Sequence, residues 1–327
     1  MQVHGKTTVR AKASSEFQKI ALIERALRRQ GAPGAAVKLG IGDDAAVLAS
    51  SGRLVWTIDT QVEGSHFERR WLPLEDVGYR SFQAAASDLA AMGARPLAAL
   101  SNLALPRAFS DAQLLRLVRG QAEAAASCRC PIIGGNLAKA PELSLTTTVL
   151  GVVDKPLLRA GARAGDELWL WGDVGLAAAG LRALQRGSSQ RAALRACVER
   201  WRRPKALLVE GRKLLGRAHC AIDVSDGLAG DAAHLGRASR VRLVFDEALL
   251  EAALAPELRR GAAALDEPPL ALALMGGEDY ALLAAGGPAR RPRGARRVGY
   301  VERGSGVFLQ RASGRQRLGV SFEHFGK

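Results

Sequence analysis

The sequence predicts a soluble globular protein that mixes helices and strands, in either an α/β or an α+β fold. Segments with apolar residues at helical spacing alternate along the chain with short segments rich in β-branched and aromatic residues, which is typical of those two classes. The 327 residues, 48% hydrophobic and 24% charged, are enough for two domains of ordinary size. We place these domains at residues 16–155 and 156–327, after a tail at residues 1–15 that we expect to be disordered.

The first elements are predicted between residues 16 and 92. Ser15 precedes a glutamine by three residues, as in a capping box, and helical spacing then predicts a helix of about four turns that ends at Gly31. Residues 54–58 are β-branched and aromatic, and predict a buried strand that delivers Asp59 at its end. Residues 74–92 are rich in alanine and predict the next helix.

A second capping box and three strands are predicted next. Ser110 again precedes a glutamine by three residues and begins a helix. Residues 131–135 read as a short strand that ends in a glycine turn. Residues 144–153 and 167–171 have the threonine, valine and tryptophan content of strands, and the domain boundary falls between them.

The C-terminal domain repeats the alternation. Helices are predicted at residues 175–185 and 190–215, and another after Gly227. One strand leads to Asp223 and a second covers residues 241–245.

The net charge of +15 raises the possibility of nucleic-acid binding. The excess arginine is spread along the chain, and its densest run lies in a Gly/Pro-rich stretch expected to be an exposed loop: Arg290, Arg291, Arg293, Arg296 and Arg297. Aromatic residues for base stacking make up only 5% of the chain. We therefore expect a solvated arginine-rich surface that attracts anionic substrates and no nucleic-acid partner, while a non-catalytic nucleic-acid-binding protein stays an alternative.

Other classes of protein are disfavoured by what the sequence does not contain. No apolar run reaches the roughly 20 residues of a membrane helix, and the first residues do not have the apolar stretch of a signal peptide, so we expect a cytoplasmic protein without membrane contact. The cysteines are not in CxxC pairs, and we expect reduced structural thiols at Cys128, Cys130, Cys197 and Cys220. Walker A, GxGxxG and GxSxG motifs are also missing.

Carboxylates next to glycines stand out in this basic chain. They occur in four short segments, at residues 42–44, 59–64, 223–227 and 276–279. Such carboxylates suit a site that holds hard divalent cations against the phosphate oxygens of a nucleotide, because Mg²⁺ takes one or two protein carboxylates and completes its shell with water and phosphate. Each segment by itself is as well explained by a turn or a helix cap, Asp88 by a solvated helix face and His66 by a satisfied polar side chain.

Taken in order, these motifs resemble the thiamine-monophosphate kinase family of the aminoimidazole-ribonucleotide-synthetase-like superfamily. The matching segments are LGIGDDA at 39–45, DTQVEGSHF at 59–67, SDLAAMGA at 87–94, IGGN at 133–136, IDVSDGL at 222–228, GGEDY at 276–280 and EHF at 323–325. The resemblance implies an N-terminal domain that binds ATP and Mg²⁺ and whose sheet forms a barrel with that of a second subunit, so a homodimer. It also implies a C-terminal α/β domain and direct, in-line phosphorylation of thiamine monophosphate by ATP.

The resemblance also assigns site residues. It implies metal ligands at Asp44, Thr57, Ile58, Asp59, Asp88, Asn136, Asp223 and Asp226. It implies nucleotide contacts at Gly135, Asn136, Arg159 and Ser225, and contacts with thiamine phosphate at His66, Glu278 and Phe322. Transfer would be assisted by Asp59, Asp223 and Arg159, with no general base, because an acceptor phosphate is already ionised at neutral pH.

The chain departs from the family pattern at several of these positions. Asn136 replaces a frequent aspartate and so removes a charge from one metal site. Ile58 offers only its backbone carbonyl, and Phe322 replaces a tryptophan. Residues 172–176 do not contain the usual Gly-Asp-Ser. Another ATP-dependent enzyme of the superfamily, with an amide or selenide as acceptor, is the second alternative.

Overall fold

The computed structural model describes residues 16–30, 36–39, 47–48 and 51–319. The expected tail at residues 1–15, together with the caps at Ser15 and Gly31, lies outside them. Within the described residues no helix is both long and apolar enough to cross a lipid bilayer.

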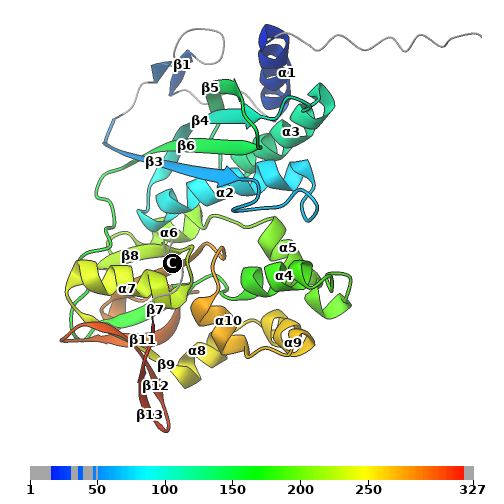
Figure 1. Cartoon of the computed structure of the whole chain (residues 1–327). Coiled ribbons are helices and arrows are strands. Elements are labelled where there is room, and N and C mark those ends of the chain that lie inside the picture. Colours follow the sequence, from blue (N-terminus) through cyan, green and yellow to red (C-terminus); the bar gives the residue numbers. More distant parts are fainter. Residues whose placement is uncertain (1–15, 31–35, 40–46, 49–50, 320–327) are drawn as a thin grey trace, which may run out of the picture.

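The N-terminal half is built on a four-stranded sheet of order β3-β6-β4-β5 (Figure 1). Its strands are β3 (Arg53–Val62), β4 (Arg95–Leu105), β5 (Ile132–Lys139) and β6 (Ser144–Val153). The pairings are antiparallel except for β4 with β5, which α3 connects in parallel. The helices of this half are α1 (Glu16–Arg28), α2 (Leu74–Ala91) and α3 (Asp111–Ser127), and a small ladder joins β1 (Val37–Leu39) to β2 (Val47–Leu48).

The C-terminal half is built on a seven-stranded sheet of order β13-β12-β9-β11-β7-β10-β8. Its strands are β7 (Glu167–Trp171), β8 (Cys220–Val224), β9 (Arg242–Asp246), β10 (Ala281–Gly286), β11 (Arg296–Glu302), β12 (Gly306–Arg311) and β13 (Gly314–Arg317). Only the β9–β12 pairing in this sheet is parallel, so α+β describes it better than α/β. In the sequence, the strands of the first sheet precede residue 155 and those of the second follow it. The domain boundary near residue 155 stays a prediction.

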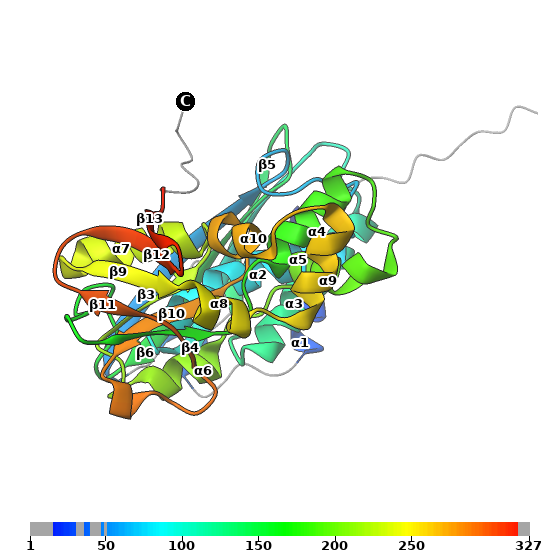
Figure 2. The same cartoon turned by 90° about the horizontal axis from the view of Figure 1, so that it is seen from below.

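Helices cover this second sheet and fill the space beside it (Figure 2). They are α4 (Leu176–Gln185), η1 (Ala192–Leu194), α5 (Arg195–Arg202), α6 (Leu208–Leu214), α7 (Leu228–Ser239), α8 (Glu247–Ala253), α9 (Pro256–Leu265), α10 (Pro269–Met275) and the short turn η2 (Pro288–Arg290).

Helix α2 is the element on which both halves pack. One side of α2 lies on β3, β4 and β6, while α6 and β8 of the C-terminal half also contact the helix. The approach of α6 is close, because a Cβ atom at Gly211 would lie 1.9 Å from the carbonyl oxygen of Ala90. A glycine is therefore required where α6 crosses α2, and the residues of α2 between the sheets are held by both.

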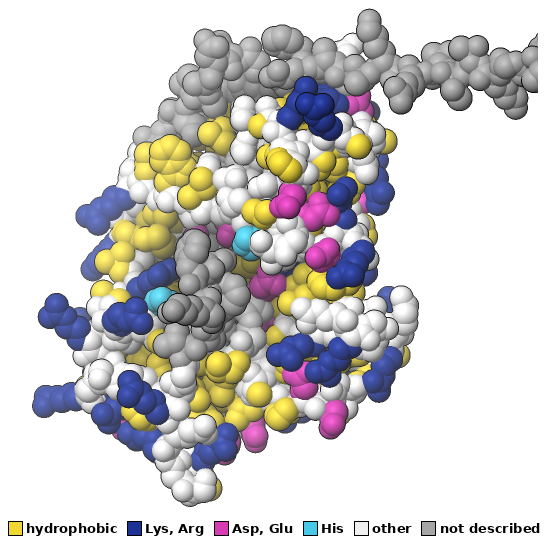
Figure 3. All heavy atoms as spheres, viewed as in Figure 1, with side chains coloured by type: hydrophobic (Ala, Val, Ile, Leu, Met, Phe, Trp, Pro, Cys, Tyr) yellow, Lys and Arg dark blue, Asp and Glu magenta, His cyan; other side chains and the backbone are white. Residues whose placement is uncertain are grey.

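The other face of the N-terminal sheet is open and apolar. Leu54, Trp56 and Ile58 alternate along β3 and expose 58%, 71% and 66% of their surface. Leu100 of β4 is 37% exposed. In Figure 3 hydrophobic side chains show over this part of the molecule, while lysine and arginine side chains are scattered over the whole visible face.

Several predicted elements are confirmed. The capping box of Ser110 is present, since its hydroxyl accepts a hydrogen bond from the backbone N–H of Gln113 and its own N–H donates to the Gln113 side chain. All four cysteines are buried and free, as expected for structural thiols, and burial raises the pKa of Cys128 and Cys197 to about 11.

Two predicted elements are wrong. The helix expected at residues 190–215 is broken into η1, α5 and α6. The break between α5 and α6 falls at Pro204, which has no backbone N–H and disfavours helical geometry at Arg203, whose φ is −129°. The glycine turn expected at the end of residues 131–135 is instead part of β5. Gly135 is needed there because a Cβ would lie 1.9 Å from the carbonyl oxygen of Ser101 on β4.

Candidate functional site

The first part of the site lies where β3 crosses α2. Thr57 and Asp59 project from the same face of β3, since side chains two residues apart share a face. The Thr57 hydroxyl donates a hydrogen bond to the carboxylate of Asp88 on α2. Burial raises the pKa of Asp59, a hydrogen bond from Gln61 opposes that shift, and the negative charge of Asp88 raises the pKa further. Asp59 and Asp88 are therefore electrostatic neighbours.

The position of Asp59 in its strand differs from the prediction. Asp59 does not follow the strand but lies inside it, opposite Thr147 of β6. The strand continues to Val62 because residues 60–62 keep their backbone pairing with β6.

Asp223 supplies a third carboxylate from the C-terminal half. It lies near the end of β8, is 5% exposed, and accepts a hydrogen bond of 2.7 Å from the hydroxyl of Ser87, the neighbour of Asp88 on α2. Burial raises the pKa of Asp223 to about 7, and Asp88 adds to that rise. Asp88 thus interacts with both Asp59 and Asp223, and three of the predicted carboxylates meet between the two sheets from β3, α2 and β8.

The loop after β8 is fixed by a residue that the sequence did not single out. The carboxylate of Asp231, in the first turn of α7, accepts hydrogen bonds of 3.0 Å from the backbone N–H groups of Ser225 and Asp226. Burial raises the pKa of Asp231 to about 8. Gly227, with φ of +104°, has no room for a side chain beside the carbonyl oxygen of Gly276. The predicted residues Ser225 and Asp226 are therefore held by an Asp five to six residues further on.

Glu278 lies next to this loop. Its backbone N–H donates to the carbonyl oxygen of Ser225 at 2.7 Å, and its carboxylate accepts hydrogen bonds from Arg80 and from the indole N–H of Trp201. Residues 276–280 form the connection from α10 to β10.

Arg159 and His66 flank the carboxylates. Arg159 is exposed, and its positive charge lowers the pKa of Asp223. The Nδ1 atom of His66 accepts a hydrogen bond of 3.2 Å from the N–H of Val62, and the electrostatic effect of His66 lowers the pKa of Asp59. Each basic side chain therefore interacts with one of the acidic residues.

Three predicted residues are not brought to the carboxylates within one chain. Ile58 projects from the opposite face of β3 to Thr57 and is exposed. Gly135 and Asn136 lie on β5, at the far edge of the sheet from β3, where the Asn136 amide donates to Asn102 at 3.0 Å. Asp44 and Phe322 lie outside the described residues.

The described donors are hard oxygen atoms of the kind that Mg²⁺ prefers. Among the residues that the structure describes, no three His, Cys, Asp or Glu side chains are grouped so that they could hold a metal ion by themselves. A protein cage of that kind is not required, because Mg²⁺ usually keeps several waters and binds one or two carboxylates together with substrate phosphates. The pairs Asp59–Asp88 and Asp88–Asp223 fit that mode of binding.

Asp279, the neighbour of Glu278, has a structural role. Its carboxylate is 1% exposed and accepts hydrogen bonds from the N–H groups of Gly175 at 2.6 Å and Ala177 at 3.0 Å, at the start of α4. Burial raises the pKa of Asp279 to about 7, and the two N–H groups oppose the shift. The side chain that caps α4 thus comes from a distant segment, while the cap residue itself is a glycine.

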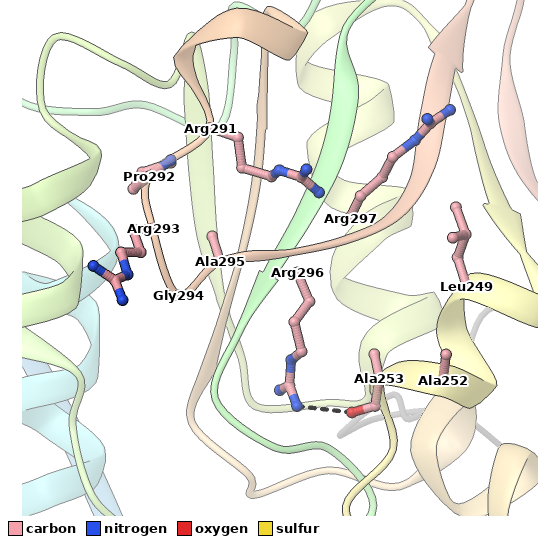
Figure 4. Close-up of a pocket in the computed structure, with 10 residues that line it drawn as sticks. All are labelled: Leu249, Ala252, Ala253, Arg291, Pro292, Arg293, Gly294, Ala295, Arg296 and Arg297. Atoms are coloured by element: carbon pink, nitrogen blue, oxygen red, sulfur yellow. Dashed lines mark hydrogen bonds between the residues drawn. The ribbon is translucent and has the colours of Figure 1, made fainter.

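The arginine-rich stretch is only partly a loop (Figure 4). Arg296 and Arg297 belong to β11, and the guanidinium of Arg296 donates to the carbonyl oxygens of Ala253 and Gly172. Arg291 and Arg297 both lie near Glu167, at 3.7 and 3.6 Å. With Arg293 and part of α8, these arginines line an open depression of about 660 Å³.

Comparison with known proteins first defines the class. Residues 42–153 match the family model described as AIR synthase related protein, N-terminal domain. This segment includes β3, α2 and the first two carboxylates of the site.

Whole-chain comparisons define the family more closely. The chain is 38% identical to the thiamine-monophosphate kinase of Mycobacterium tuberculosis over 291 residues. The aligned region covers 88% of this chain and 85% of the relative. The solved thiamine-monophosphate kinase of Stenotrophomonas maltophilia is 33% identical, with a TM-score of 0.79 over 90% of this chain and 96% of that one. The structure of AaThiL complexed with AMPPCP and TMP is 31% identical, with a TM-score of 0.76 over 93% and 96%. The chain belongs to the thiamine-monophosphate kinase family, which is a family of phosphotransferases.

Proposed function

We propose that this protein uses ATP and Mg²⁺ to phosphorylate thiamine monophosphate, and so forms thiamine diphosphate. The observation that carries the proposal is the meeting of Asp59, Asp88 and Asp223 between the two sheets. It is supported by relatives that are named thiamine-monophosphate kinase and by the relative solved with both AMPPCP and TMP. AMPPCP has the triphosphate chain of ATP with one bridging oxygen replaced by carbon.

The cation would be held by carboxylates of this chain. Asp59, Asp88 and Asp223 are the described candidates, and the family motif adds Asp44 and Asp226. When bound, Mg²⁺ supplies positive charge that reduces the repulsion between two phosphate-bearing reactants.

Neighbouring residues orient these carboxylates and add positive charge beside them. Thr57 donates a hydrogen bond to Asp88 and fixes the orientation of its carboxylate. The hydrogen bond from Ser87 orients the carboxylate of Asp223 and lowers its pKa. Arg159 adds positive charge beside Asp223. No side chain has to remove a proton, because the attacking phosphate oxygen is already ionised, so the transfer depends on positioning and electrostatics.

Contacts with the two reactants follow the family pattern. We assign the nucleotide to Gly135, Asn136, Arg159 and Ser225, and the thiamine phosphate to His66, Glu278 and Phe322. Direct in-line transfer between them requires no covalent enzyme intermediate.

We also propose that a second copy covers the open face of the N-terminal sheet, in a barrel formed by the two sheets. Leu54, Trp56 and Ile58 form a row of exposed apolar side chains on the edge strand β3, and large exposed apolar patches mark interaction surfaces.

The test of the activity is direct. Purified protein is incubated with ATP, Mg²⁺ and thiamine monophosphate, and thiamine diphosphate is measured by chromatography. The proposal predicts equal amounts of ADP and thiamine diphosphate. Parallel reactions contain selenide or no acceptor. ATP consumption that is the same without thiamine monophosphate, or faster with selenide, would refute the assignment in favour of another member of the superfamily.

A further inference from the structure

A fully buried guanidinium lies between the two halves of the protein. Arg80 projects from α2 and has no exposed surface. Its Nε donates to the side-chain oxygen of Gln61 at 3.4 Å, its Nη1 to the backbone oxygen of Trp201, and its Nη2 to Glu278. The guanidinium carbon also lies 4.7 Å from the centre of the Trp201 ring. Burial of a charge is costly unless the charge is paired and hydrogen-bonded, and each of these contacts offsets that cost.

The contacts of Arg80 lead to both ends of the site: the cation end, formed by Asp59, Asp88 and Asp223, and the thiamine end, which contains Glu278. On one side, the Gln61 amide that accepts from Arg80 donates a 3.2 Å hydrogen bond to Asp59. On the other side, Glu278 is bound by Arg80 through one oxygen and by the Trp201 indole N–H through the other, at 2.6 Å. One guanidinium therefore connects an acidic residue of the cation end with the acidic residue assigned to the thiamine end.

The backbone at Glu278 is held in a strained conformation. Glu278 and Tyr280 have φ of +65° and +51°, in the left-handed region that side chains other than glycine seldom adopt. Such conformations are strained and persist where the surroundings impose them, often at functional sites. Here the N–H groups of Glu278 and Tyr280 donate to Ser225 and Val224, and the side chain of Glu278 is fixed by Arg80.

We propose that Arg80 is a positioning residue, which fixes Glu278 directly and Asp59 through Gln61, and so sets the two ends of the site relative to each other. This inference rests on the proposed function for the identity of the two ends. Arginine is required because its planar guanidinium donates in three directions at once, whereas a lysine ammonium at this position is a compact point charge that cannot reach Gln61 and Glu278 together.

The central variant is Arg80→Lys, which keeps the positive charge opposite Glu278. Its matched control is Arg203→Lys. Arg203 also bridges two elements, with hydrogen bonds to Asp76 of α2 and Glu123 of α3, and it stacks on Tyr79 at 3.9 Å, but none of its contacts reaches the site. Both replacements exchange a guanidinium for an ammonium. Arg80→Lys does so within the proposed connection between Asp59 and Glu278, and Arg203→Lys does so at a contact with α2 that is not part of it.

A second variant separates the two ends. Gln61→Glu keeps an oxygen to accept from Arg80 but removes the amide that donates to Asp59. It therefore alters the cation end and leaves the Arg80–Glu278 pair in place. It also keeps the proposal testable if Arg80→Lys does not fold.

Two quantities are measured for each variant. The first is the Mg²⁺ concentration that gives half of the thermal stabilisation produced by ATP, which needs no turnover. The second is the KM for thiamine monophosphate, with kcat measured alongside it. If the wild-type protein makes no thiamine diphosphate, the proposed function fails, and the Mg²⁺ midpoint alone decides the role of Arg80.

The expected results differ between variants. Arg80→Lys raises both the Mg²⁺ midpoint and the KM by about 10- to 100-fold, the range seen when residues that orient ligands are changed. Gln61→Glu raises the Mg²⁺ midpoint and changes the KM by less than about twofold, and Arg203→Lys changes neither by more than that. The proposal is overturned if Arg80→Lys leaves both quantities unchanged, if Arg203→Lys alters them as much, or if Gln61→Glu leaves the Mg²⁺ midpoint unchanged.

Discussion

Replacement of Ser87 by alanine should weaken the binding of Mg²⁺ and ATP without disturbing the fold. The Ser87 hydroxyl is fully buried and donates a 2.7 Å hydrogen bond to Asp223, which is itself 5% exposed. A hydrogen bond to a charged group contributes about 1.5–3 kcal/mol, and alanine removes it without adding volume. Because 1.4 kcal/mol is a factor of ten in affinity, we expect the apparent Kd for Mg²⁺ with ATP to rise by about 10- to 150-fold.

The effect of Ser87→Ala should depend on pH. Burial already raises the pKa of Asp223 to about 7, and loss of a donor to its carboxylate raises that pKa further. At neutral pH a larger fraction of Asp223 then carries a proton and cannot hold a cation. Because the proton is lost as pH rises, the defect should be largest at neutral and lower pH and shrink in alkaline buffer.

Calorimetric titration of ATP and Mg²⁺ at several pH values is the appropriate assay. Ser81→Ala is the matched control, since Ser81 is 1% exposed on the same helix but its hydroxyl donates only to the carbonyl oxygen of Gly78, within α2. Thermal unfolding of both variants checks the fold. If the two variants bind equally well, or if the defect of Ser87→Ala is the same at every pH, the reasoning about Asp223 is wrong.

Three further predictions follow from single features of the fold. Gly135→Ala should lower the free energy of unfolding by about 1–3 kcal/mol in urea titrations, because its Cβ would overlap the Ser101 oxygen; Gly134→Ala, which meets only a side chain at 3.0 Å, should cost less. Trp56→Lys should convert the proposed dimer to a monomer in light scattering without loss of helical circular dichroism, and an unchanged mass would contradict the interface. The pKa of Asp279 is raised in the folded protein, so between about pH 4 and about pH 7 the native state holds a proton that the unfolded state has released. The contribution of Asp279 to the free energy of unfolding should therefore fall as pH rises from about 4 to about 7 and then level off. In urea titrations, Asp279→Asn should remove this dependence on pH.

The parts of the fold that could be predicted are those with local causes. The capping box at Ser110 and the helix at residues 74–92 depend on neighbours a few residues apart, and both are present. The helix break at Pro204 also has a local cause and was missed because the apolar spacing continues past the proline. The role of Gly135 depends on the backbone of β4, which is distant in sequence, so the glycine pair suggested a turn.

The same division applies to the site. Asp59, Asp88 and Asp223 could be singled out because their motifs follow a family pattern, and the structure brings them together. Arg80 was missed because a charged residue on an alanine-rich helix normally faces solvent. Asp231 sits inside a helix that has no motif of its own, and only the fold shows that its carboxylate supports the loop before it.

Helix α2 fixes both the distance and the relative direction of the side chains that it carries into the site. Arg80 and Ser87 are seven residues apart, which is two turns and a rise of about 10 Å, so they point in nearly the same direction. One extra residue inserted between them would turn one of these side chains by about 100° relative to the other. Insertions and deletions should therefore be excluded from the interval between residue 80 and residue 87, which keeps a fixed number of residues.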